Sequence, residues 1–195
     1  MQEVPRVWPK ATVYGFEADP HNFVGLWHNL IKKKAGAWSG VHIQHAALHH
    51  TDGKQITIRT RDGIGSQSMI YAPTDTYNEK WPWITWGANY TVETLALGPW
   101  SRRKGVKRVD LIYLDVECAE LDVLRGAREL LSNVTVLSLE VSLVSLCEGT
   151  ALWADVERWI RARGFRPLVL PQTPWDSRFD FTAIRESAIR GRPAR

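Results

Sequence analysis

Short apolar runs alternate with amphipathic segments along most of the 195-residue chain. Runs of a length and composition typical of buried strands occupy residues 11–17, 41–48, 109–115 and 134–141. Segments whose apolar residues recur every three or four positions, as on one face of a helix, are about 19–36, 119–131 and 152–164. Because strands and helices alternate, the pattern predicts an α/β domain with a mainly parallel sheet.

The first helix has a start and a stop signal. Asp19 is a suitable N-cap, Pro20 suits the first helical position, and Gly36 can end the helix after three lysines. The residues expected on its buried face are Phe23, Leu26, Trp27, Leu30 and Ile31.

The remaining segments predict further strands and loops. Residues 54–60 and 66–72 are expected to pair as a hairpin, 73–89 to form a loop rich in Trp and Pro, and 90–97 to form a strand. The last strands are expected at 165–170 and 179–184. We therefore divide the chain into an N-terminal extension (1–10), one domain (11–186) and a basic, disordered tail (187–195).

Three carboxylates fall at or just after predicted strand ends. Glu17 ends the first strand, Asp115 follows the apolar run 111–114, and Glu140 lies at the end of 134–141. Ligands of parallel α/β sheets bind beyond the carboxyl ends of the strands. These acids are therefore candidates for one ligand site.

Charge and cysteine content narrow the function class. The net charge is +4, and basic residues gather in a predicted loop at 101–108 and in the tail. One alternative function is therefore nucleic-acid binding through the loop 101–108. The two cysteines, Cys118 and Cys147, form neither a CxxC pair nor a zinc spacing, which favours reduced thiols. With neither a membrane-length apolar run nor a signal-peptide core, we expect a cytoplasmic protein without a membrane partner.

Four motifs together resemble the FkbM-type methyltransferases. They are "VYGFEADPHNFVGLWHNL", "HAAL" followed by "DG", "DLIYLDVECAELDVLRGARELL" and "LSLEV". The resemblance covers roughly residues 11 to 185. It implies a Rossmann-like methyltransferase fold with a C-terminal antiparallel hairpin, S-adenosylmethionine (SAM) as methyl donor, and O-methylation of a small-molecule or sugar hydroxyl.

The resemblance also implies a donor site. Glu17 corresponds to the acid that binds the two ribose hydroxyls of SAM, while His45 and Ala46 lie near the adenine contacts. A carboxylate suits a vicinal diol because it accepts two hydrogen bonds. Alternatively, the charge of Glu17 stabilises the N-terminal end of the following helix, and His45 and Ala46 serve only in packing at the end of the strand.

On the acceptor side, the resemblance places Asp115 and Glu117 beside the reacting groups and Glu140 toward the substrate. A carboxylate there would accept a proton from the hydroxyl or orient it. Both acids could instead cap the following helix.

The chain also departs from the family pattern. No D-x-G-x-x-x-G turn is found, so we expect the first strand and helix of the family fold to be missing. Cys118 stands where the family usually has Gly, and Ala96 where it tends to have Asp. These departures favour a second alternative, a truncated or non-catalytic relative.

Two clusters have open interpretations. His42, His45, His49 and His50 lie close in sequence, but Asp52 is the only carboxylate nearby, so we expect exposed turn histidines and no metal. The Trp-rich residues 81–86 could cover a substrate, pack on the domain or contact a second subunit. The oligomeric state is left open.

Overall fold

The computed structural model describes residues 7–33, 40–61, 67–168 and 177–190. Its strands are β1 (Val13–Glu17), β2 (Val41–His45), β3 (Ala47–Leu48), β4 (Gln55–Arg61), β5 (Ser68–Met69), β6 (Trp86–Leu95), β7 (Val109–Leu114), β8 (Val134–Ser142), β9 (Phe165–Pro167) and β10 (Arg178–Arg185). Its helices are α2 (Pro20–Lys33), α3 (Asp75–Lys80), α4 (Leu97–Lys104), α5 (Glu120–Ala127), the 3₁₀ helix η1 (Arg128–Asn133), α6 (Trp153–Arg161) and α7 (Glu186–Arg190).

The described strands form three sheets, with the orders β1-β2, β3-β6-β4-β5 and β7-β8-β10-β9. The pairs β1–β2, β3–β6 and β7–β8 are parallel, whereas β4 pairs antiparallel with β5 and β6, and β10 with β8 and β9. The α/β class, the β4–β5 hairpin and the antiparallel C-terminal strands agree with the sequence-based predictions.

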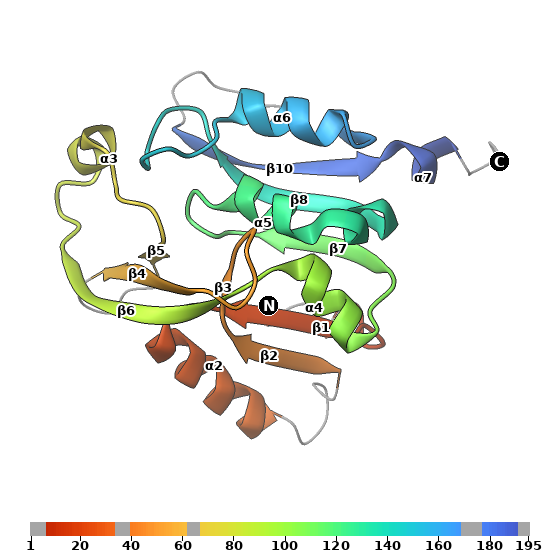
Figure 1. Ribbon diagram of the computed structural model, residues 1–195, viewed down its shortest axis with the longest axis horizontal. Coiled ribbons are helices and arrows are strands. Elements are labelled where there is room, and N and C mark those ends of the chain that lie inside the picture. Colours follow the sequence, from red (N-terminus) through yellow and green to blue (C-terminus); the bar gives the residue numbers. More distant parts are fainter. Residues whose placement is uncertain (1–6, 34–39, 62–66, 169–176, 191–195) are drawn as a thin grey trace.

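Strand direction brings the predicted site segments to one side of the molecule. The arrowheads of β1, β2 and β7 point the same way in Figure 1, and the segments that follow Glu17, His45 and Leu114 begin there. The parallel β1–β2 and β7–β8 pairings are consistent with this arrangement, which the sequence pattern anticipated.

The main core lies between β7, β8, β10 and the helices α5, η1 and α6. The predicted inward leucines of the 119–131 segment are all buried: Leu121, Leu124, Leu130 and Leu131. They pack in one cluster with Leu137, Phe181 and other strand residues. Trp153, Val156 and Ile160 of α6 are buried there as predicted, while Trp159 packs at its edge.

Helix α2 begins as predicted but buries less than predicted. The Asp19 carboxylate accepts the backbone N–H groups of His21 and Asn22, as an N-cap does. Leu30 is buried, but Trp27 and Ile31 are 43% and 51% exposed. The predicted inner face is therefore wrong at these two residues, although the Trp27 ring stacks with Phe23 of the same helix. The predicted stop, Gly36, lies outside the described residues.

Strand β7 also buries less than its apolar run predicted. Ile112 and Leu114 face the core, but Leu111 and Tyr113 on the opposite face are 43% and 61% exposed. Within the described residues, β7 pairs only with β8 and β1 pairs only with β2. The prediction of a strand buried on both faces is thus wrong for the described structure.

Three segments expected to be irregular are helical. Helix α3 interrupts the Trp- and Pro-containing segment, with the Thr74 hydroxyl as its N-cap, and β6 begins at Trp86 instead of Tyr90. Helix α4 includes the first half of the basic segment and ends at Gly105, whose φ is 69°. Residues 187–190 belong to α7, so the predicted disorder is wrong there, whereas 191–195 lie outside the described residues.

The two cysteines form a disulfide, with Sγ atoms 2.01 Å apart. The prediction of reduced, unpaired thiols is therefore wrong. The residues are 29 positions apart in sequence, so the pairing depends on tertiary contact between two loops. Among the described helices, none combines the length and hydropathy that a membrane span requires.

Candidate functional site

The three residues predicted to bind the methyl donor lie together where β1 and β2 end. Glu17 and His45 are opposite each other in the parallel register, and the N–H of Ala46 donates to the carbonyl oxygen of Glu17 at 3.0 Å. Ala46 is buried at 4% exposure, while Nε2 of His45 lies 3.0 Å from the carbonyl oxygen of Ala18. The sequence therefore predicted their proximity correctly, and their ligand roles stay a prediction.

The Glu17 carboxylate is partly engaged within the turn between β1 and α2. Its Oε1 accepts the N–H of Asp19 at 2.8 Å. Burial raises the pKa of Glu17, and the nearby Asp19 charge raises it further, while the N–H donors oppose this. A half-buried carboxylate at a strand end can still accept hydroxyl protons, because each oxygen has two lone pairs.

The residues predicted on the acceptor side form a second group around Arg178 of β10. The guanidinium Nη1 lies 2.8 Å from Glu117 and 2.9 Å from Glu140, forming a three-membered ion cluster. Asp115 is exposed and lies close enough to raise the pKa of both glutamates, although burial is the larger cause and Arg178 opposes it.

Glu140 differs from its prediction in one respect. It lies inside β8, which continues to Ser142, and its backbone pairs with Asp180 of β10. The strand runs further because the late strand β10 pairs along it. Its side chain nevertheless joins the group that follows β7, through Arg178.

The loop after β7 has an unusual backbone. Glu117 and Cys118 have φ angles of 48° and 77°, a region that glycine adopts without strain and other residues rarely adopt. The Cys118 side chain leaves this loop to form the disulfide with Cys147. The Cys118 departure from the family pattern therefore attaches the Glu117 loop to a second loop of the domain.

Glu120 was not among the predicted site residues. It is 6% exposed, and its Oε1 accepts the N–H of Val116 at 3.2 Å. Burial raises its pKa to about 7, against the N–H donors that lower it, and the charges of Glu140 and Glu117 contribute. A carboxyl with this pKa suits a general base at neutral pH. Its position in the first turn of α5 carries no sequence signal of this burial.

Arg178 was also missed, because nothing near it in the sequence shows that its partners come from the loop after β7 and from β8. The Trp81 ring lies 5.1 Å from its guanidinium. Trp81 and Trp86 pack with the buried Tyr77, whereas Trp83 is 66% exposed. The Trp-rich segment therefore packs on the domain and also borders the ion cluster.

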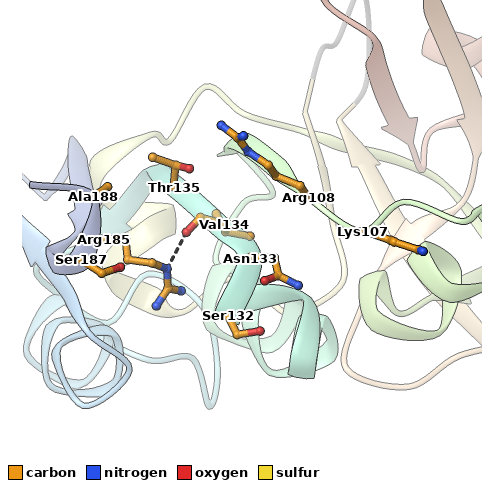
Figure 2. Close-up of a pocket in the computed structure, with 9 residues that line it drawn as sticks. All are labelled: Lys107, Arg108, Ser132, Asn133, Val134, Thr135, Arg185, Ser187 and Ala188. Carbon is orange, nitrogen blue, oxygen red and sulfur yellow. Dashed lines mark hydrogen bonds between the residues drawn. The ribbon is translucent and has the colours of Figure 1, made fainter. Parts of the chain in front are cut away.

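The two groups lie beside one core. Phe16 of β1, next to Glu17, and Val116, next to Asp115, both pack against the main cluster. Two surface hollows lie elsewhere. One, of about 450 Å³, is lined by Lys107, Arg108 and Arg185 at the opposite strand ends, where Arg185 Nε donates to the carbonyl oxygen of Val134 (Figure 2). The other, of about 490 Å³, lies beside Trp100 and Gln44.

The basic segment 101–108 is largely paired within the molecule. Arg102 contacts Glu129 at 3.0 Å, Arg103 contacts Asp52 at 2.6 Å, and Arg108 contacts Asp110 at 2.7 Å. These surface pairs reduce the positive field that a phosphate backbone would encounter.

Comparison with known proteins identifies the chain's relatives. The profile of the methyltransferase FkbM domain matches residues 2–167. The 2-O-methyltransferase NoeI of Sinorhizobium fredii (strain NBRC 101917 / NGR234) is 28% identical over 147 residues, which are 72% of this chain and 58% of that protein. The chain thus spans less than two thirds of the length of this relative. No solved structure matches significantly.

Proposed function

Because the chain belongs to the methyltransferase FkbM family, we propose that it transfers a methyl group from SAM to a hydroxyl of a small molecule or sugar. The observation that carries the proposal is the placement of Glu17 and of Asp115, Glu117 and Glu120 beyond strands that point to one side of the molecule. The similarity to a 2-O-methyltransferase supports an oxygen acceptor.

For the donor, the residues at the ends of β1 and β2 fit one part of SAM. Glu17 would accept the ribose hydroxyls, and the peptide around His45 and Ala46 would contact the adenine. When bound, SAM supplies an electrophilic methyl group on a sulfonium. The described residues contain no glycine-rich turn between β1 and β7, so the fit extends to the nucleoside end alone.

For the acceptor, the group around Arg178 supplies carboxylates of two kinds. Asp115 is exposed and can orient a hydroxyl or accept its proton, whereas Glu120 is buried and accepts the N–H of Val116 in the loop that carries Asp115. Arg178 holds Glu117 and Glu140 in place. Methyl transfer depends chiefly on alignment of donor and acceptor, so a few positioned groups are enough.

The Rossmann-like form of the fold is part of this proposal. A parallel strand from outside the described residues would pair with the open edges of β1 and β7 and join the two sheets. Exposed Leu111 and Tyr113 support this, because an accompanying helix would cover them.

Calorimetry with SAM tests the proposal. We expect Glu17→Gln, which keeps the acceptor for the Asp19 N–H, to weaken SAM binding by about 10- to 100-fold, as expected for loss of charge-assisted hydrogen bonds. Glu79→Gln, at an exposed position of α3, is the matched control. Absence of SAM binding to the unmodified chain, or equal binding by both variants, would contradict the donor site.

The second candidate is a non-catalytic relative, and the lack of a glycine-rich turn among the described residues favours it. Binding of SAM without transfer of its labelled methyl group to any polyol or sugar would support this candidate. We do not propose a nucleic-acid partner, because the basic segment is already ion-paired.

We further propose that the protein works in the cytoplasm. A stable disulfide is rare in that reducing compartment, so the thiol state provides the test. If the protein works there, the disulfide is held reduced in the cell and forms only on oxidation, so alkylation of Cys118 and Cys147 in freshly lysed cells, read by mass spectrometry, should find free thiols. Full protection from alkylation would point to an oxidising compartment.

A further inference from the structure

His49, His50 and Asp122 come together from distant parts of the chain. The histidines follow β3, and Asp122 lies in the first turn of α5. Nε2 of His49 lies 3.6 Å, and Nδ1 of His50 3.1 Å, from the Asp122 carboxylate oxygens. The three potential ligand atoms all lie within 4.8 Å of one another. We propose that these residues form a binding site for a divalent transition metal ion such as zinc.

The donor set and spacing fit this class of ion. Two imidazoles and one carboxylate are ligands that zinc takes at about 2.0–2.2 Å, with a water in the fourth position of an open site. Ligand atoms of a tetrahedral zinc are then about 3.4 Å apart. The two contacts with Asp122, at 3.6 and 3.1 Å, lie near this spacing and the two histidine nitrogens lie within 4.8 Å of each other, so side-chain rotation can close the three groups around one ion. His50 is 47% exposed and provides access for the ion.

The surroundings hold the ligands in place. Tyr71 donates its hydroxyl proton to Asp122, as outer groups of metal sites orient a ligating carboxylate. A Cβ on Gly126 would overlap the carbonyl oxygen of His49, so α5 packs directly against the histidine backbone. Asp122 and His49 are only 14% and 13% exposed, which limits competition from water.

The hydrogen bonds of His49 define what must change when the ion binds. Its Nδ1 accepts the N–H of Thr51 at 3.2 Å, which leaves the ring proton on Nε2, facing Asp122. The metal replaces this proton, and a proton on Nδ1 can then be donated to the Thr51 hydroxyl oxygen, 2.8 Å away. Binding therefore requires His49 to change its tautomer, with the ring proton on Nδ1.

One neighbouring group opposes the ion. Arg125 lies 3.7 Å from Asp122 and repels a cation there. The site therefore predicts opposite effects for two kinds of substitution. Loss of a ligand should weaken binding, and loss of the Arg125 charge should strengthen it. A surface histidine that binds metal adventitiously would not show this pair of effects.

The experiment uses tag-free protein freed of metal with chelator and without SAM, so its outcome is independent of methyl transfer. We expect ZnCl₂ to bind one ion per chain in calorimetry and CoCl₂ to produce visible ligand-field absorption. His50→Ala and Asp122→Asn should each weaken binding by at least about tenfold, and Arg125→Gln should strengthen it several-fold.

His28→Ala is the matched control, since His28 is an exposed histidine of α2, and its affinity should be unchanged. Because His50 is half exposed, His50→Ala remains informative if Asp122→Asn fails to fold. No binding to the unmodified chain, or equal binding by His50→Ala, His28→Ala and Arg125→Gln, would overturn the proposal.

Discussion

Glu120 illustrates how burial changes a single carboxyl. It is 6% exposed, and its pKa rises to about 7 from a usual value of 4.5, mainly because burial penalises the charged form. The folded state therefore binds this proton more tightly than the unfolded state. Its contribution to stability is fully present below about pH 4.5 and is lost as the pH rises through about 7.

The Glu120→Gln variant tests this at the residue scale. Gln keeps an acceptor for the Val116 N–H but has no charge to bury. We expect the variant to match the wild type near pH 5 and to be more stable near pH 8.5, by about 3 kcal/mol at most. Urea unfolding at the two pH values measures the difference. An equal difference in unfolding free energy between variant and wild type at both pH values would show that Glu120 does not titrate near neutrality.

Sequence reasoning names candidates at this scale where a residue follows directly from a strand end. Glu17, Asp115 and Glu117 were found because each comes just after an apolar run. Glu120 and Asp122, only a few positions further, were missed as site residues. Their burial and partners depend on how α5 packs, which no local pattern states.

At the element scale, Arg178 connects three parts of the fold. It lies on β10 and contacts Glu117 after β7 and Glu140 on β8, all three side chains being at most 25% exposed. The two carboxylates repel each other, and Arg178 is the group that lowers the pKa of both against the effect of burial. The cluster therefore depends on one cation.

We expect Arg178→Met to lower the free energy of unfolding by about 2–4 kcal/mol at pH 8, because it leaves two partly buried carboxylates without a counter-charge. Without Arg178 the folded-state pKa values of Glu117 and Glu140 rise further above 4.5. The deficit should thus shrink as the pH falls and the carboxyls take up protons. Chemical unfolding between pH 5 and 8 measures it.

Arg178→Lys is the matched control. It keeps the positive charge and should recover most of the lost stability, since both contacts are made by one nitrogen. A pH-independent loss of stability in Arg178→Met, or no recovery of stability in Arg178→Lys, would indicate that Arg178 stabilises the fold through packing and not through its charge.

The prediction of helices failed where a short helix signal lay next to residues typical of loops. Helix α4 was read as part of a basic connection, although Arg102–Lys104 followed by Gly105 is a typical helix end. Helix α3 was obscured by the Pro and Trp residues after it. Strand β7 was predicted correctly in extent but not in burial, because a cover on its outer face depends on other elements.

At the scale of the whole molecule, the disulfide closes a loop between Cys118 and Cys147, 29 positions apart. A cross-link of this length stabilises the fold by about 3–4 kcal/mol, through the restricted unfolded chain. The disulfide also holds the loop that contains Glu117 against the apolar cluster that includes Tyr77 and Met69.

We expect a double variant, Cys118→Ala with Cys147→Ala, to lose about 3 kcal/mol of unfolding free energy. Reductant should lower the stability of the wild type by a similar amount and leave the double variant unchanged. Urea unfolding with and without reductant measures both effects. Two thiols titrating in unreduced, folded protein would contradict the pairing.

The sequence by itself determined the strands and helices of the main core, the α/β class and the candidates that directly follow strand ends. These features follow from local periodicity, because the spacing of apolar residues decides which face of an element can be buried. Only the tertiary structure decided the Cys118–Cys147 disulfide, the Arg178 cluster and the meeting of His49 and His50 with Asp122. Each joins residues distant in sequence, and such contacts are set by how elements pack and pair.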